Sequence, residues 1–266
     1  QLVREHQHRY LEGGEEFVRG FNLALESIHA SSEIALKRSL KILISEKNQH
    51  GEGVANACLA ERLLWFGDST RALPLAQRAW KLAEVHSYEA DFIRAARLHG
   101  AAALGLNEFD TATERFQHAL TRARAVNLVQ EELATITALA ELHRRRHESS
   151  GAREILDQIW ELAERGPCPT LHADALNVLA QIERDEGNTK AAIAAATKAY
   201  TLAWCDGPPY AYHYGLTNAR KHLQELGAPE PQLPPFDESK FEPMPDVELN
   251  PKDEFWVDPD ELDSRN

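Results

Sequence analysis

The segment ALPLAQRAWKLA, residues 72–83, recurs as a pattern at residues 112–123 (ATERFQHALTRA), 152–163 (AREILDQIWELA) and 192–203 (AIAAATKAYTLA). Each copy starts 40 residues after the one before it, and alanine stands at both ends of every copy. Apolar residues also occupy the fifth and eighth positions, so each copy forms one apolar stripe along an α-helix. A fixed period of this length is typical of stacked helical units rather than of a single globular core.

A second series with the same spacing lies upstream of each copy, at Ala60, Gly100, Ala140 and Ala180. We interpret it as the crossing point of a first helix, where a small residue lets two helices approach closely. The sequence therefore predicts one helix pair per repeat. The predicted division of the chain is a degenerate first repeat at 1–50, four units of 40 residues at 51–206, a capping helix at 207–227 and a tail at 228–266.

The formal net charge of −13 is concentrated in the tail. Residues 228–266 hold twelve Asp and Glu against three Lys and Arg, and eight of the thirteen prolines. Acidity of this kind excludes a general nucleic-acid binder, because neutralising phosphates needs clustered basic residues. No apolar run has the length of about 18–20 residues that a bilayer span requires. We expect a soluble, cytoplasmic protein that binds neither nucleic acid nor membrane.

The repeats resemble those of tetratricopeptide-repeat proteins, which place a small residue in the first helix and Ala, a large apolar residue and Ala in the second. Here these are, in one unit, Gly100 followed by Ala112, Phe116 and Ala119. The resemblance covers residues 50–204 well and 10–49 loosely. The usual period of that family is shorter, and its late proline is absent here. The fold that the resemblance implies is all-α: a right-handed α-solenoid of helix hairpins with a C-terminal capping helix and an extended acidic, Pro-rich tail.

The resemblance also implies that a ligand lies in the concave groove formed by the first helices. The groove positions of the family fall here on Arg94, Arg97, Thr137, Glu141, Arg144, Arg145, Asn177, Gln181 and Arg184, with Asp174 among the mapped residues. Arginine pairs bidentately with carboxylates, which suits an acidic peptide. The alternative is that these residues form the solvated face of surface helices. The excess of arginine over acid among them favours a binding groove.

Two other features of the sequence are candidates for binding sites. His143 and His147 have the i, i+4 spacing of a zinc-binding pair, but no acidic residue lies between them, and cations at a helix C-terminus are the better explanation. The tail carries Phe236, Phe241, Phe255 and Trp256 in an acidic context. We hypothesise that it docks on its own repeats as an extended strap; a flexible tail is the alternative. We expect no metal, no cofactor and no catalysis.

The leading interpretation is a scaffold that binds a protein or peptide. The segment from Trp204 to Tyr210 with the acidic tail resembles the end of repeat arrays in bacterial signalling proteins of the NACHT and STAND type, in which the array is the sensor. No GxxxxGK[ST] phosphate-binding motif occurs, so an ATPase would have to precede Gln1. The alternative function is a structural module for self-assembly into oligomers, without a separate ligand.

Overall fold

The computed structural model describes residue 17 and residues 29–86, 88–163, 168–208 and 210–240. The chain divides into two units, Gln1–Pro235 and Phe236–Asn266, and each is described by itself. In the second unit, the described residues contain one short 3₁₀ helix, η1 (Glu238–Lys240). All the α-helices named below belong to the first unit. The first part of the predicted degenerate repeat, residues 1–28, lies outside the described residues apart from Phe17.

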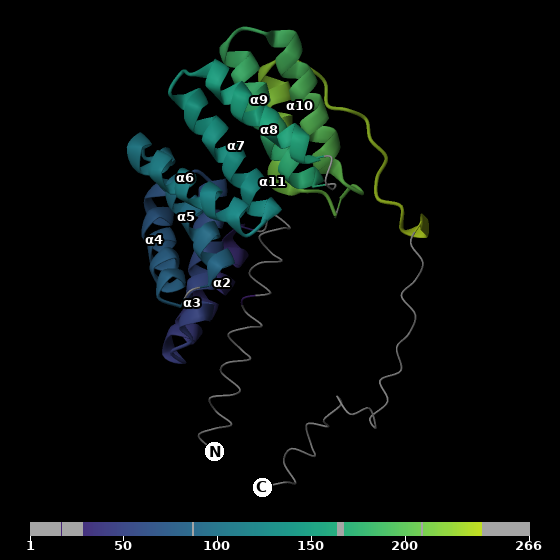
Figure 1. Ribbon diagram of the computed structural model, residues 1–266. Helices are drawn as coiled ribbons and strands as arrows, with labels where there is room; N and C mark the ends of the chain where they lie inside the picture. The colour runs from purple at the N-terminus through teal and green to yellow at the C-terminus, as the bar shows by residue number, and fades with distance from the viewer. Residues whose placement is uncertain (1–16, 18–28, 87, 164–167, 209, 241–266) are drawn as a thin grey trace. The chain divides into compact units, whose positions relative to one another are not determined.

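The described part of the first unit is all-helical and has no strand (Figure 1). Its helices are α2 (His29–Ser45), α3 (Gln49–Trp65), α4 (Ser69–His86), α5 (Glu89–Gly105), α6 (Phe109–Ala125), α7 (Val129–Arg145), α8 (Ser149–Ala163), α9 (Pro169–Asp185), α10 (Thr189–Trp204) and α11 (His213–Glu225). From α3 to α10, each helix begins half a sequence period after the previous one. The period read from the sequence is therefore the length of a helix pair, and the predicted α-solenoid is confirmed.

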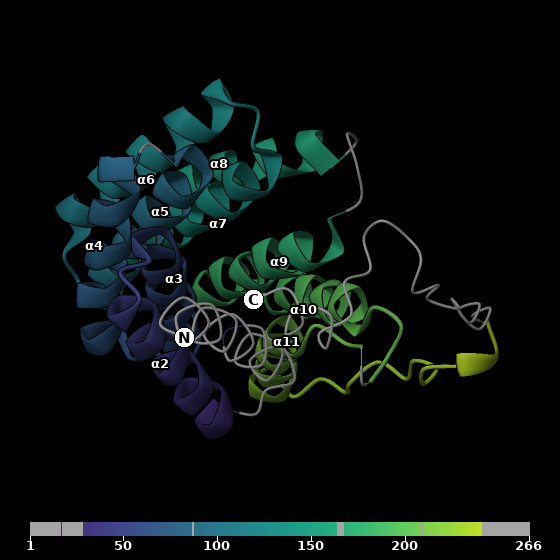
Figure 2. The same cartoon turned by 90° about the horizontal axis from the view of Figure 1, so that it is seen from below.

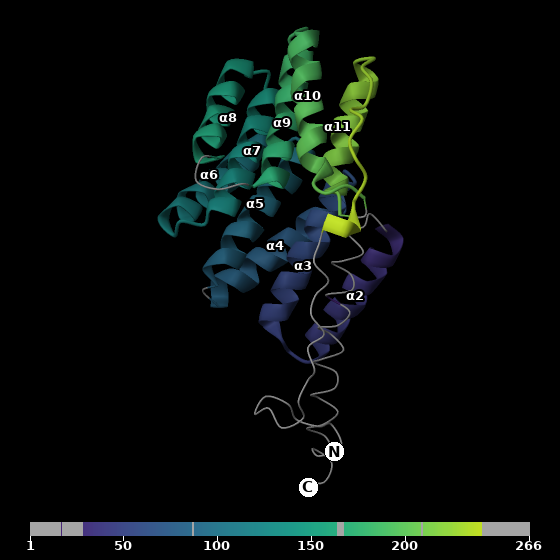
Figure 3. The same ribbon diagram turned by 90° about the vertical axis from the view of Figure 1, so that its right-hand side faces the viewer.

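Two sets of helices alternate along the stack. The helices α3, α5, α7, α9 and α11, called the inner helices here, pack on their sequence neighbours and also on the next inner helix. The helices α4, α6, α8 and α10, the outer helices, make their extensive contacts with sequence neighbours alone (Figures 1 and 3). Side chains at equivalent positions of successive inner helices therefore lie next to one another. This is the arrangement that a solenoid uses to present one continuous face.

The apolar stripe of the repeats forms the core, as predicted. Ala72, Ala112, Ala152 and Ala192 are all fully buried, and so are the residues four positions later in each copy, Ala76, Phe116, Leu156 and Ala196. At one crossing point, a smaller residue on the inner helix is combined with a larger residue on the outer helix. A Cβ added at Gly100 would lie 2.7 Å from the ring of Phe116, the largest of these core residues. Glycine on the inner helix thus provides the space that phenylalanine fills on the outer helix.

The turns between helices recur as regularly as the helices do. A residue with positive φ lies at the helix C-terminus at Lys47, Gly67, Asn107, Asn127, His147, Gly187, Cys205 and Gly227. In most of these turns, the next amide donates to a carbonyl five residues earlier, as Asp68 N does to Leu63 O at 2.9 Å. This hydrogen bond is characteristic of the Schellman motif. Glycine or asparagine occupies five of the eight positions because both tolerate this conformation.

The C-terminal cap is one helix, as predicted, but it begins later than the sequence suggests. The capping helix is expected at residues 207–227, whereas α11 begins at His213. The amides of Tyr210 and Tyr212 donate instead to the carbonyls of Gly207 and Ala203, so this segment forms a turn against α10. The apolar residues of α11 then complete the core of the last helix pair.

Candidate binding surface on the inner helices

The residues expected to line a groove do lie on three successive inner helices. Arg94 and Arg97 belong to α5; Thr137, Glu141, Arg144 and Arg145 to α7; and Asn177, Gln181 and Arg184 to α9. Because these helices begin one full repeat apart, equivalent positions fall at the same level of the stack. Their side chains share one surface, which we call the inner face. The structure brings the arginines together with carboxylates that the sequence analysis did not include.

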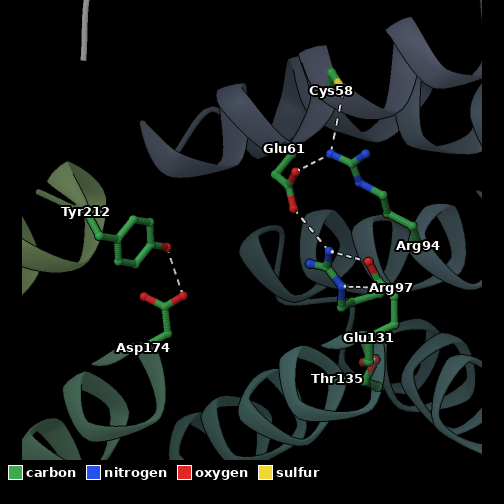
Figure 4. A network of polar contacts seen from close by, with 8 residues as sticks. All are labelled: Cys58, Glu61, Arg94, Arg97, Glu131, Thr135, Asp174 and Tyr212. Atoms are coloured by element: carbon green, nitrogen blue, oxygen red, sulfur yellow. Dashed lines mark hydrogen bonds and ion pairs between the residues drawn. The ribbon is translucent and has the colours of Figure 1, made fainter. Parts of the chain in front are cut away.

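Arg94 and Arg97 take part in one network that joins three inner helices (Figure 4). Arg94 Nη2 donates to Glu61 on α3 at 2.6 Å and lies 3.5 Å from the Cys58 sulfur. Arg97 donates to Glu61 at 3.0 Å and, through Nε, to Glu131 on α7 at 2.7 Å. Burial alone raises the pKa of Glu61, but the charges of the two arginines outweigh it and hold the pKa at about 2. Glu61 is therefore ionised at neutral pH.

The arginines of α7 and α9 are paired in a similar way. Arg144 donates twice to Glu141 one turn earlier, at 2.7 and 2.8 Å, and also pairs with Asp185 on α9. Arg184 pairs with Glu225 on α11. Both pairs between helices join residues 41 positions apart, one repeat and one residue. These contacts connect neighbouring repeats along the inner face.

The remaining predicted groove residues mostly bond within the chain. Thr137 donates its hydroxyl to the Leu133 carbonyl of its own helix at 3.0 Å. The Gln181 amide reaches the Asn177 carbonyl at 3.5 Å, a weak contact. Arg145 turns away toward the previous repeat, where it donates to the Leu104 carbonyl at 2.8 Å and to the Asn107 side chain at 2.6 Å. Arg145 thus fixes the turn between α5 and α6, within the previous repeat.

These contacts change the chemistry expected of the surface. The arginines were expected to offer unpaired positive charge, but each ion pair named above neutralises one of them within the chain. The predicted set did not include the acidic partners Glu61, Glu131, Asp185 and Glu225, although Glu61 and Asp185 stand at whole-repeat spacings from its members Glu141 and Arg145. Opposite charges 41 positions apart could have revealed Asp185 and Glu225, the partners of Arg144 and Arg184, but not Glu61 and Glu131.

Asp174, on α9, lies beside this network and is paired differently (Figure 4). Its Oδ2 accepts a hydrogen bond from the Tyr212 hydroxyl at 2.9 Å, and its Oδ1 is buried without a partner. Burial raises the pKa of Asp174 to about 7; the Tyr212 hydroxyl and Arg97 lower it, and the negative charge of Glu61 raises it. One turn later, Asn177 donates to the Gly215 carbonyl at 3.0 Å. Both residues thus connect α9 with the beginning of α11.

One aromatic contact links the two ends of the described stack. Trp65, the last residue of α3, stacks on Tyr214 of α11 with ring centroids 5.4 Å apart. Tyr214 in turn meets the ring of Tyr212 edge-on at 6.3 Å. Figure 2 brings α3, α9 and α11 into one view. The inner face therefore includes a contact between residues about 150 positions apart in sequence, which no local pattern predicts.

Two other kinds of site are absent from the described residues. No group of three or more His, Cys, Asp and Glu side chains lies close enough together to hold a metal ion in the described ranges. No helix in that part of the chain is long and apolar enough to cross a membrane. Cys58 is buried, and burial raises the pKa of its thiol, so the neutral thiol predominates at neutral pH.

An all-α stack of helix pairs, with a 40-residue period and small residues at the crossing points, is a tetratricopeptide-like helical-repeat fold. Among solved structures, the chain is similar to the crystal structure of aspartyl phosphate phosphatase F from Bacillus subtilis, with a TM-score of 0.61 and 16% sequence identity. The match covers 84% of this chain and 61% of that one, so this chain spans about three-fifths of that protein. The similarity shows the fold alone. The chain matches no protein-family model and no curated protein.

Proposed function

We propose that the chain is a protein-binding scaffold whose inner face receives an extended segment of a partner. The observation that carries this proposal is the continuity of the inner face. Side chains from α3, α5, α7, α9 and α11 meet there and are fixed by ion pairs between repeats. A surface held in this way is organised before a partner arrives, which lowers the entropic cost of binding.

The wider context is part of the same proposal. The repeat array is the sensor or interaction module of a larger cytoplasmic protein of bacterial signalling or defence. Its support is the resemblance of the segment from Trp204 to Tyr210 and of the acidic tail to repeat arrays of that kind. Repeat scaffolds commonly present extended surfaces to partners. The fold by itself does not assign a function.

A charge-swap experiment tests whether the arginines of the inner face contact a partner. The probe is a set of 12-residue peptides selected from a random displayed library on the immobilised chain. Arg184→Glu alone places two carboxylates against each other, whereas Arg184→Glu with Glu225→Arg restores an ion pair of reversed direction. We expect the double variant to melt within a few degrees of the wild type and to bind the peptides at least tenfold more weakly.

Two results would count against the binding proposal. Unchanged peptide affinity in the double variant would show that Arg184 does not contact the peptide. Mass that rises with concentration in light scattering, together with no selected peptide on the inner face, would favour the alternative of a self-assembly module.

We propose further that the beginning of the tail is held on the last repeat. Glu230 accepts hydrogen bonds from Tyr200 at 3.0 Å and from Arg220, and Trp204 Nε1 donates to the Pro234 carbonyl at 2.7 Å. Leu233 packs against the last core cluster. The tail aromatics Phe241, Phe255 and Trp256 lie outside the described residues. A chain ending at residue 227 should melt several degrees below one ending at residue 235; equal melting temperatures would contradict the docking.

A further inference from the structure

Two side chains of α9 carry buried oxygen atoms without hydrogen-bond partners. These are Oδ1 of Asp174 and Oδ1 of Asn177, one helical turn apart on the same face of the helix. Asn177 is only 4% exposed. Buried polar atoms in folded proteins nearly always have a partner. Because Asn177 Oδ1 is an acceptor, and Asp174 Oδ1 is one whenever the carboxyl is ionised, the group that complements them is a hydrogen-bond donor.

Asp174 is also the exception among the acidic residues of the inner helices. On α3, α5, α7, α9 and α11, every other Asp and Glu forms an ion pair with an arginine or a histidine of the described chain. Asp174 forms none with the described residues; its contact is the neutral Tyr212 hydroxyl. On these helices, Asp174 is therefore the one acidic side chain whose negative charge no cation of the described chain balances in an ion pair.

The groups around Asp174 favour a cation as well. The titratable groups that act on it are Tyr212 just before α11, Arg97 on α5 and Glu61 on α3. Because burial raises the pKa of Asp174 to about 7, the carboxyl is near half-protonation at neutral pH, and a bound cation would ionise it. Tyr212, which donates to Asp174, meets the ring of Tyr214 edge-on, and Tyr214 stacks on Trp65. Aromatic faces attract cations, and guanidinium groups in particular.

We propose that Asp174 and Asn177 form a subsite for the guanidinium group of one arginine in the partner segment. The subsite deepens the proposed function and rests on it, because the arginine arrives as part of a segment on the inner face. A guanidinium carries five donors in a planar fork and reaches two acceptors on one helix face. A lysine ammonium is a compact point charge and fits two separate acceptors less well.

The test uses the full chain and the same library of random 12-residue peptides. We expect an arginine at one fixed position of the selected peptides. Replacing it by citrulline, a neutral group of the same shape, should weaken binding at least tenfold in calorimetry, and replacing it by lysine should weaken binding less. Asp174→Asn keeps an acceptor for Tyr212 and should weaken the binding of arginine-containing peptides at least tenfold. In that variant, citrulline should cause little further loss, because the charged pair is already removed.

A matched control and a second readout separate this subsite from a general effect of charge. Asp157→Asn makes the same substitution at an exposed position of α8, an outer helix, and should leave affinity unchanged. Binding at pH 7 should also release about half a proton per complex in the wild type and none in Asp174→Asn. Calorimetry in buffers of different ionisation enthalpy measures this proton release.

The outcomes distinguish this inference from the function on which it rests. Two results would overturn the subsite without contradicting the scaffold proposal. The first is a set of peptides that bind the inner face of the wild type and of Asp174→Asn equally well, and the second is a set of selected peptides that carry no arginine. A library that yields no peptide on the inner face overturns both.

Discussion

At the scale of single residues, Asp174 is a group whose protonation at neutral pH differs from that of a free carboxyl. Burial raises its pKa in the folded chain from 3.8 to about 7. As pH rises, the unfolded chain loses this proton first, so the stability that comes from a protonated Asp174 is present below about pH 4 and is lost as pH approaches 7. The wild type should therefore lose stability over this range through Asp174.

We expect Asp174→Asn to become more stable than the wild type as the pH rises from 4 to 8. The difference should reach a few kcal/mol, because each pKa unit corresponds to about 1.4 kcal/mol. Urea unfolding of both proteins across this pH range measures it, and Asp157→Asn provides the comparison for an exposed carboxylate. A difference between the two proteins that stays constant with pH would contradict the raised pKa.

A second residue-scale prediction concerns His147, which adopts φ of 63° at a turn where other repeats have Gly67 and Gly187. A left-handed conformation costs a non-glycine residue about 1 kcal/mol. His147→Gly should therefore raise the free energy of unfolding by up to about 1 kcal/mol, and Gly67→His should lower it. A Cβ at Gly67 would meet no atom within 4 Å, so the reciprocal change reports the backbone and not crowding. Denaturant unfolding that shows the opposite order would refute this explanation.

At the scale of helices, the pair Gly100 and Phe116 sets the spacing between α5 and α6. A methyl group at Gly100 would lie 2.7 Å from the Phe116 ring, closer than side chains approach. We expect Gly100→Ala to lower the free energy of unfolding by about 1–3 kcal/mol through this overlap. Adding Phe116→Leu, the residue that stands at the equivalent Leu156, should restore part of the loss. Thermal unfolding of the two single variants and the double variant measures the coupling, and strictly additive effects would contradict the steric account.

The helices and their core could be predicted from the sequence, whereas the pairing on the inner face could not. The apolar stripe and the small residues at the crossing points are local and recur in every repeat, so position alone identifies them as core. The partner of an arginine is set by a neighbouring helix, and a long side chain reaches partners at different offsets. Arg97 pairs with residues 36 and 34 positions away, and Arg144 with residues 3 and 41 away. No single spacing predicts these pairs.

At the scale of the whole stack, most contacts join helices that are close in sequence, as a solenoid requires. The Trp65–Tyr214 contact is different, because it depends on how the rotation between repeats accumulates from α3 to α11. This accumulated geometry cannot be read from the pattern of one repeat. The contact should make the first and last repeats unfold together.

We therefore expect Trp65→Ala to broaden the urea transition and to accelerate hydrogen exchange in α11 more than in α7, which lies in the middle of the stack. Trp65→Phe keeps an aromatic ring for Tyr214 and should behave like the wild type. Equal acceleration in all helices would mean that Trp65 acts only on overall stability. No acceleration in α11 would mean that the contact does not couple the two ends.

The central claim is that the inner face, and no other surface, receives the partner. Hydrogen exchange measured with and without a saturating selected peptide tests it most directly, because bound backbone is protected from exchange. We predict slower exchange in α5, α7 and α9, with the outer helices α4, α6 and α8 unchanged. Protection confined to the outer helices would contradict the claim.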